Sequence, residues 1–241
     1  MATWVTHLMV ADRVLERIPA LCRHEFCVGS IAPDCNVENE DWTAFIPPRE
    51  VTHWMTGGRK VAADCDRFVR EYMDKRQIAS AQEESFLLGY YAHLITDAEF
   101  QRTIRDEERV KAAWGRVLAL PHLREKAADL PATWDSIKLL LPAKERMRDV
   151  HTLDREYLEQ HPASGYLTEI MGLKSFPDYI DYLPKNAIPR KVKVMGVLPE
   201  VSTWAYAYIA MTAEEYHAFV DRTVDLVACA VAKYLSRKSV C

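Results

Sequence analysis

Apolar residues recur every three or four positions along most of the chain, which is the spacing of an amphipathic helix. Pro19 ends the first such segment, whose apolar positions are Val5, Leu8, Met9, Val14, Leu15 and Ile18. The last segment follows Thr212 and Glu215, a pair with the spacing of a helix-capping box. Strand-like alternation is scarce, so the pattern predicts an all-α fold, a single multi-helix domain over residues 1–241.

Between these ends the pattern predicts helices over 61–76, 143–160 and 163–172. A further helix should begin at Ser80, because Ser80 and Glu83 have the spacing of a capping box. The Ser80 helix is apolar almost all round from residue 86 to 95, so it should be central and buried. Residues 105–119 continue as a charged amphipathic helix, and Pro121, Pro131 and Pro142 separate shorter helices. The stretch 28–59 is rich in Pro and Gly, and the stretch 174–202 is rich in Pro and Lys and contains Gly196; both are predicted to be long irregular connections.

Composition narrows the class of protein without identifying it. Hydrophobic residues make up 49% of the chain and charged residues 27%, and the formal net charge is −4, which offers no overall attraction to nucleic acid. No apolar run is long enough to predict a membrane span. Asp12, Arg13 and Glu16 interrupt the N-terminal pattern, so no signal peptide is expected and the expected location is the cytoplasm.

The six cysteines include three that are close in sequence, Cys22, Cys27 and Cys35. A zinc site on these three is one interpretation, but the chain lacks the paired Cys-x-x-Cys spacing typical of metal–thiolate sites. Reduced and mostly buried thiols are the preferred interpretation.

His93 and Asp97 form the sharpest local feature. They are four residues apart in the most apolar predicted helix, so their side chains lie one turn apart on one face. An ionised Asp is costly in such surroundings unless a cation or a donor meets it. A shared divalent metal satisfies that requirement, and a plain His–Asp hydrogen bond within the core is the alternative.

Three further residues carry groups that suit the same ion: Asp34 after Pro33, His53 in a predicted loop, and His7 on the first helix. Each has an ordinary alternative, a helix-capping Asp or a His satisfied within the core. Imidazole and carboxylate ligands together suit zinc, manganese or iron, and an open position on such a metal can activate a water.

The order Thr6-His7, Gly-Ser-Ile-Ala-Pro-Asp34, Thr-His53 and Gly-Tyr-Tyr-Ala-His93-Leu-Ile-Thr-Asp97 resembles the zinc-dependent phospholipase C family, over about residues 1–100. That family is related to the single-strand-specific zinc nucleases. The resemblance implies an all-helical fold and phosphodiester hydrolysis by three zinc ions. It implies that Asp34, His53, His93 and Asp97 bind one metal, and that His7 binds a second, which Asp97 bridges.

The sequence departs from the family pattern around the other metals. In secreted members the mature N-terminal residue completes the second site, whereas no signal peptide is expected here. Thr103 stands where the motif places a His, and a later His-x3-Glu pair is missing, since Lys126 and Arg155 follow His122 and His151 at that spacing. We therefore expect a reduced centre with one Zn²⁺ ion and room for a second.

Three function hypotheses follow. The first is a metal-dependent hydrolase of a small phosphoester or phospholipid, with Asp34, Asp97 or Glu99 as proton acceptor and Arg102 and Arg105 as candidate phosphate ligands. The second is a metal-binding protein of the same fold with lost or altered catalysis, in a binding or regulatory role. The third is a broader metal-dependent phosphohydrolase with mixed His and Asp ligands. A phospholipid substrate needs an apolar approach surface, for which Trp42, Phe45 and Trp54 are candidates. The sequence does not indicate the oligomeric state.

Overall fold

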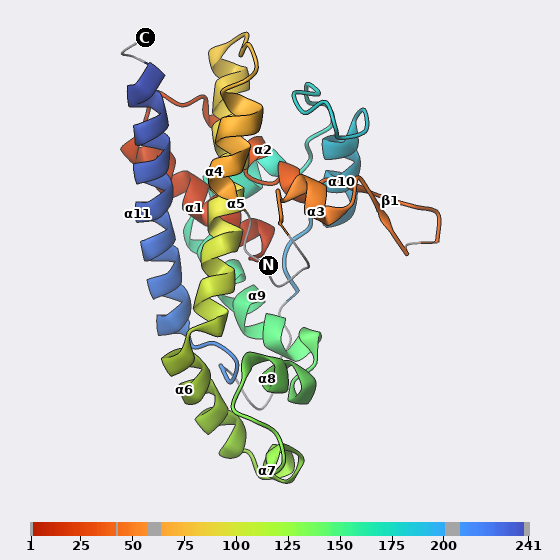
Figure 1. Cartoon of the computed structure of the whole chain (residues 1–241), viewed down its shortest axis with the longest axis vertical. Helices are drawn as coiled ribbons and strands as arrows, with labels where there is room; N and C mark the ends of the chain where they lie inside the picture. The colour runs from red at the N-terminus through yellow and green to blue at the C-terminus, as the bar shows by residue number, and fades with distance from the viewer. Residues whose placement is uncertain (1, 42, 57–63, 201–207, 239–241) are drawn as a thin grey trace.

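The computed structural model describes residues 2–41, 43–56, 64–200 and 208–238, and within them the fold is all-α, as predicted. Figure 1 shows the helices and one short hairpin, made of the antiparallel strands β1 (Val37–Glu38) and β2 (Phe45–Ile46). The helices that form the site are α1 (Trp4–Arg17), α2 (Arg23–Gly29), η1 (Ala32–Asp34), α3 (Arg49–Thr52), α5 (Ala81–Arg105) and α9 (Ala143–Gln160). The others are α4 (Cys65–Phe68), η2 (Val69–Met73), α6 (Glu107–Leu118), α7 (Pro121–Ala127), α8 (Trp134–Leu140), η3 (Tyr166–Ile170), α10 (Ala187–Met195) and α11 (Ala213–Lys238).

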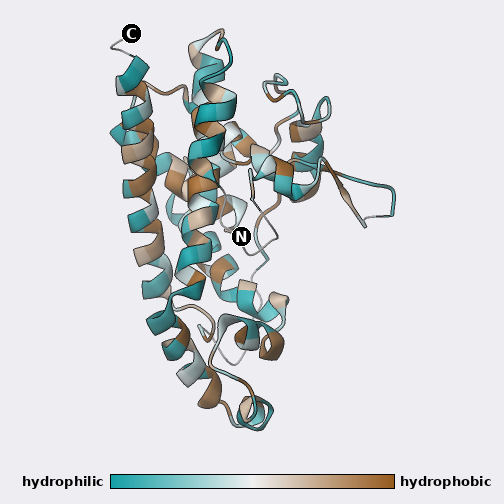
Figure 2. Ribbon diagram, viewed as in Figure 1, coloured by the Kyte–Doolittle hydropathy of each residue, from teal (hydrophilic) through white to brown (hydrophobic). Residues whose placement is uncertain are grey.

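Two long helices, α5 and α11, run side by side along the long axis of the molecule (Figure 1). Both begin at the predicted caps: the Ser80 hydroxyl accepts from the Glu83 amide, and Thr212 and Glu215 bond each other reciprocally. Apolar and polar residues alternate along both helices (Figure 2), and Phe100 meets Phe219 between them with ring centroids 5.4 Å apart. The segment 86–95 of α5 is buried, as predicted.

Helix α2 crosses α5 at very short range, because a glycine on each helix faces the backbone of the other. A Cβ atom at Gly29 would lie 2.1 Å from the Phe86 carbonyl oxygen, and one at Gly89 would lie 2.2 Å from that of Phe26. No residue with a side chain fits at either position without moving a helix. The crossing fixes the end of α2, and the chain that follows it, against the centre of α5.

Helices α6, α7 and α8 enclose a second, smaller apolar cluster beyond the end of α5. The predicted proline breaks agree with these helices: α7 begins at Pro121, and α9 begins directly after Pro142. Helix α9 covers residues 143–160, as predicted, and it brings one face back to the larger core.

The predictions for three segments were wrong in part. The stretch 174–202 contains α10, in which Pro189 is the third helical residue; a proline is tolerated in the first turn because the amide there has no helical acceptor. Only residues 166–170 of the predicted helix 163–172 are helical, as the π-helix η3. The predicted helix 61–76 appears as α4 followed by η2, and its positions 61–63 lie outside the described residues.

Candidate metal centre

Five polar side chains from four separate elements meet in the larger core. His7 lies on α1, Asp34 ends η1, His53 follows α3, and His93 and Asp97 lie one turn apart on α5. Their side chains are almost entirely excluded from solvent. The Tyr90 hydroxyl donates to the Thr52 carbonyl, which ties the end of α3 to α5. The structure thus brings together all five residues predicted to bind metal.

Asp34, His53 and His93 form one group with metal-ligand spacing, and Asp97 lies beside it. His53 Nε2 lies 3.3 Å from Asp34 Oδ1, 3.3 Å from His93 Nε2 and 3.6 Å from Asp97 Oδ2. His93 Nε2 lies 4.0 Å from Asp97 Oδ2. Ligand atoms about 2.0–2.2 Å from a tetrahedral zinc are separated from one another by roughly 3.3–3.6 Å. The observed separations are close to those that such an ion requires.

The hydrogen bonds on the outer sides of the rings leave the inner nitrogens with lone pairs. His93 Nδ1 lies 2.8 Å from the carbonyl oxygen of Ser30, so it must carry the proton. The Thr52 hydroxyl donates to the Arg49 carbonyl and can therefore accept from His53 Nδ1, 2.9 Å away. With these tautomers both Nε2 atoms are acceptors that face each other, which is unfavourable without a cation or proton between them. The outer hydrogen bonds are those of metal-binding histidines.

His7 gives a second, independent indication. Its ring stacks on His93 with centroids 3.8 Å apart, and both of its nitrogens are buried without a hydrogen-bond partner. His7 Nε2 lies 3.6 Å from Asp97 Oδ1, while Asp97 Oδ2 faces His53. Buried polar atoms without a partner are uncommon in proteins. A cation beside His7, His93 and Asp97 would bind Nε2 of His7, and Asp97 would then bridge two ions.

The charge states agree with metal binding. Burial, together with the neighbouring His7, lowers the pKa of His93 to about 3, so this ring is neutral and can act as a ligand near neutral pH. Burial alone would raise the pKa of Asp34, but His53, whose Nε2 lies 3.3 Å from Asp34 Oδ1, and the nearby His93 hold it below its ordinary value. Asp97 behaves in the same way beside His7 and His93. Both carboxylates are therefore charged.

Donors from outside the group also bind these two carboxylates. The Trp4 indole donates to Asp34 Oδ2 over 3.1 Å, and the Ala2 amide donates to Asp97 Oδ1 over 3.1 Å. The Arg49 guanidinium donates to Asp97 Oδ2 over 2.9 Å. Such partners fix the orientation of a ligand and raise the precision of a site.

Glu99 is not brought into this group. Its two oxygens accept from Arg102 and from Arg222 of α11, and Arg222 also donates to the Thr103 hydroxyl over 2.8 Å. An arginine therefore binds the residue that stands in place of the family's next histidine. Arg105 donates to Gln101 on its own helix, so neither Arg102 nor Arg105 reaches the His and Asp group through these contacts.

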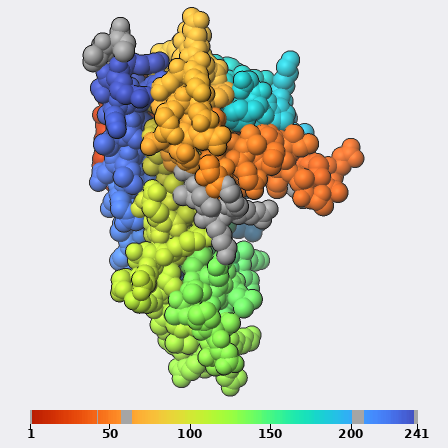
Figure 3. All heavy atoms as spheres, viewed as in Figure 1, coloured from red at the N-terminus to blue at the C-terminus, as the bar shows by residue number. Residues whose placement is uncertain are grey.

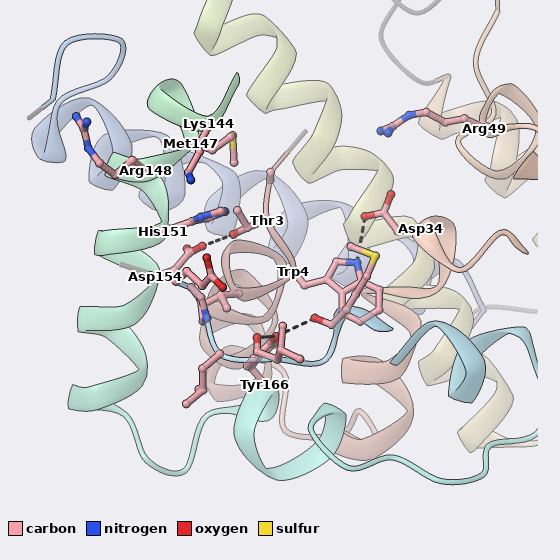
Figure 4. A pocket seen from close by; sticks show the side chains of 17 residues that line it. Thr3, Trp4, Asp34, Arg49, Lys144, Met147, Arg148, His151, Asp154 and Tyr166 are labelled. Atoms are coloured by element: carbon pink, nitrogen blue, oxygen red, sulfur yellow. Dashed lines mark hydrogen bonds between the residues drawn. The ribbon is translucent and has the colours of Figure 1, made fainter. Parts of the chain in front are cut away.

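A pocket of about 730 Å³ reaches the centre at Asp34 and Arg49 (Figure 4). The opposite wall is α9, which contributes Lys144, Met147 and His151 at spacings of three and four residues. Arg49 and Lys144 were not predicted from the sequence. The helical repeat of polar residues on α9 was a usable signal, but nothing in the sequence indicated that this face of α9 lies opposite Asp34.

The remaining lining of the pocket is mainly apolar, from Trp4, Val5, Met195, Val197 and Leu198. Asp154 lies deeper, fully buried, and accepts from Thr3, Thr6 and Tyr216. The pocket therefore combines the centre, several cations and an apolar wall.

Within the described residues, the groups with metal-ligand spacing are His7, His93 and Asp97, and Asp34, His53 and His93. Neither group contains a cysteine. Among the described residues, no helix is long and apolar enough to cross a membrane.

Comparison with known proteins supports the resemblance. The family model described as zinc dependent phospholipase C matches residues 6–99, the stretch that contains all five residues of the centre. No curated protein and no solved structure matches the chain. The family supports a metal-dependent, phospholipase-like role, in agreement with the His and Asp groups of the structure. Over residues 6–99, the chain is similar to the zinc-dependent phospholipase C family.

Proposed function

We propose that the protein is a zinc-dependent hydrolase that cleaves a phosphoester with an apolar group, in the manner of a phospholipase C. The observation that carries the proposal is the pocket, in which Asp34 of the buried His and Asp group shares one space with cationic and apolar side chains. A phosphoester with an acyl or similar apolar part needs all three surfaces.

The residues that would hold the metal are His53, His93, Asp34 and Asp97, with His7 as a ligand of a second ion. When bound, zinc supplies a Lewis acid and lowers the pKa of a water ligand toward neutrality. Asp34 and Asp97 keep the charged form that proton acceptance requires. Glu99 stays a predicted base, to be tested with Glu99→Gln, although its oxygens bind two arginines.

The cationic side chains bind the phosphate in this proposal. Arg49 borders the centre and the pocket at once, and Lys144 faces it from α9 (Figure 4). Positive groups near the phosphate stabilise the charge that develops on its oxygens during hydrolysis. Met147, Met195 and Leu198 supply the apolar wall, on which the non-polar part of the substrate packs.

A second candidate is a metal-binding protein of the same fold with lost or altered catalysis. The contacts that favour it are the hydrogen bonds from Arg222 to Glu99 and Thr103. Thr103 stands where the family motif has a histidine, so the guanidinium of Arg222 lies where the family would bind a third metal. In a centre with fewer metal ions, fewer groups share the activation of water and the neutralisation of the phosphate charge, which disfavours catalysis. The cytoplasmic location stays a prediction under either candidate.

Hydrolysis assays separate the two candidates. The zinc-loaded protein is incubated with a chromogenic phosphodiester, a chromogenic phosphomonoester and a short-chain phospholipid, beside His93→Ala and the exposed control His217→Ala. The proposal predicts turnover of at least one substrate by the wild type and by His217→Ala, and none by His93→Ala. Zinc bound to the wild type without turnover of any substrate would favour the second candidate.

A further inference from the structure

Large apolar side chains lie exposed beside the mouth of the pocket. We call Phe45, Ile46, Val194, Met195, Val197 and Leu198 the apolar rim; each is 40–59% exposed. Scattered exposed apolar residues are ordinary, but a continuous group beside a pocket marks an interaction site. Of the sequence candidates for an approach surface, Phe45 belongs to the rim, Trp54 packs on Phe68 and Tyr72, and Trp42 lies outside the described residues.

The rim is continuous with the pocket. Met195, Val197 and Leu198 are exposed at the surface and also line the cavity. Their backbone is fixed from below, because the hydroxyl of buried Tyr166 donates to the carbonyl oxygens of Val197, at 2.6 Å, and Met195, at 3.3 Å. A molecule on the rim therefore has direct access to the pocket.

Helix α10 and the hairpin form one unit. Buried Lys191 makes an ion pair with Glu38 on β1, and its ammonium group lies 5.2 Å from the centre of the Phe45 ring on β2. Val194 is three residues after Lys191 and so lies on the same side of α10. The hairpin projects well beyond the body of the molecule (Figure 3), which makes the rim accessible to a broad, flat partner.

The charges around the rim indicate the chemistry of that partner. Lys185, Arg190 and Lys193 are exposed on or before α10, and the pocket adds Lys144. Glu40 and Asp41 lie in the hairpin turn, and exposed Glu200 follows the rim, so attraction to an anionic surface comes from the basic residues on and before α10. Apolar side chains beside exposed lysine and arginine are the features that bind the interface of an anionic bilayer.

We propose that the apolar rim binds the surface of an anionic lipid bilayer and presents the pocket to molecules within it. A second copy of the chain fits the rim less well, since a symmetric contact would place the basic residues of α10 against themselves. The proposal requires neither bound metal nor catalysis, so its failure and the failure of the proposed function are distinguishable.

The test is sedimentation of the full-length protein with vesicles of phosphatidylcholine alone or with one fifth phosphatidylserine, in EDTA to prevent turnover. We expect binding to the anionic vesicles that weakens at high salt. Val197→Asp with Leu198→Asp should reduce the partition coefficient at least about tenfold, because two apolar side chains no longer enter the interface. Lys193→Ala should reduce it about fivefold, the contribution of one lysine near an anionic surface.

Leu139→Asp is the matched control, since Leu139 is 72% exposed on α8 and does not line the pocket. We expect this variant to bind as the wild type does, and thermal melts confirm that all variants are folded. Absence of binding to anionic vesicles, or an equal loss in Leu139→Asp, would overturn the proposal. Velocity sedimentation without lipid completes the test. A dimeric wild type that does not bind vesicles, together with a monomeric Val197→Asp/Leu198→Asp variant, would overturn the proposal and show that the rim is a self-association surface.

Discussion

The Nε2 atoms of His53 and His93 lie 3.3 Å apart, although the outer nitrogen of each ring has a hydrogen-bond partner that assigns it the proton. Two lone pairs therefore face each other in the core, with the carboxylates of Asp34 and Asp97 beside them. Such a group is stable only with a positive charge among its members. The centre thus links the stability of the protein to the binding of a cation.

The first prediction concerns removal of the metal. Zinc at one hundred times its Kd should stabilise the folded state by about 2.7 kcal/mol, since the ligands converge only there. For a chain of this length, that corresponds to a rise in Tm of roughly 5–10 °C over the EDTA-treated protein. Calorimetry with zinc and with EDTA measures the difference. The rise should be present in His217→Ala and absent in His93→Ala; a zinc-dependent rise that survives His93→Ala would place the metal elsewhere.

The second prediction concerns the close crossing of α2 and α5. Gly29→Ala should lower the free energy of unfolding by at least about 3 kcal/mol, because the new methyl group would overlap the Phe86 carbonyl. It should also weaken zinc binding, since the Ser30 carbonyl that orients His93 follows directly. Denaturant unfolding and zinc titration measure both effects.

Gly115→Ala is the control for that substitution. Gly115 lies within α6 with open space around its Cβ position, so alanine should raise stability by about 0.5–1 kcal/mol through helix propensity. Equal stability of the two alanine variants would contradict the close contact of α2 with α5.

The third prediction concerns pH. Burial raises the pKa of Asp154 to about 7, above its ordinary value of 3.8, against the lowering effect of the Thr3, Tyr216 and Thr6 hydroxyls. The folded protein thus holds a proton there that the unfolded chain releases above about pH 4, so this contribution to stability is complete below pH 4 and decreases as the pH rises to 7. The decrease is about 1.4 kcal/mol per pH unit.

Asp154→Asn removes this titration. The free energy of unfolding of the wild type, relative to Asp154→Asn, should fall by roughly 2–3 kcal/mol between pH 5 and pH 7 and then level off. Urea unfolding at four pH values gives the comparison. A difference between the two proteins that is independent of pH would refute the raised pKa.

The fourth prediction concerns phosphate binding. Lys144→Ala should raise KM about tenfold for a phosphoester and leave the zinc content unchanged, because a hydrogen bond to a charged group contributes about 1.5–3 kcal/mol. The control is Lys233→Ala on the exposed side of α11. If Lys144→Ala lowered kcat alone, or matched Lys233→Ala, the lysine would not bind the substrate.

Most of the helices could be predicted from the sequence because their ends and apolar spacing are determined by local patterns. The Ser80 and Thr212 caps, the prolines at 121 and 142, and the helical spacing in α1 and α9 each act within a few residues. Helix α10 was missed because it lies in a stretch rich in proline and lysine, and its helical geometry depends on packing of Ile188 and Val192 against the core.

The residues of the site also divide into those that local patterns predicted and those that they did not. The spacing of His93 and Asp97 followed from the sequence alone, and the family resemblance added Asp34, His53 and His7. The contacts of Arg49 with Asp97 and of Arg222 with Glu99 join residues 48 and 123 positions apart, and such pairs follow from tertiary packing rather than local pattern. The wall formed by α9 opposite Asp34 is unpredictable for the same reason.

The most direct test of the central claim is the zinc content of purified protein, measured by elemental analysis on wild type, His93→Ala and His217→Ala after dialysis against excess zinc. His93 belongs to both ligand groups, so its loss affects either ion. We predict at least one zinc per chain in the wild type and in His217→Ala, and less than about one tenth of that in His93→Ala, since loss of a ligand leaves too few for tight binding. Equal zinc in all three proteins would contradict the account of the centre.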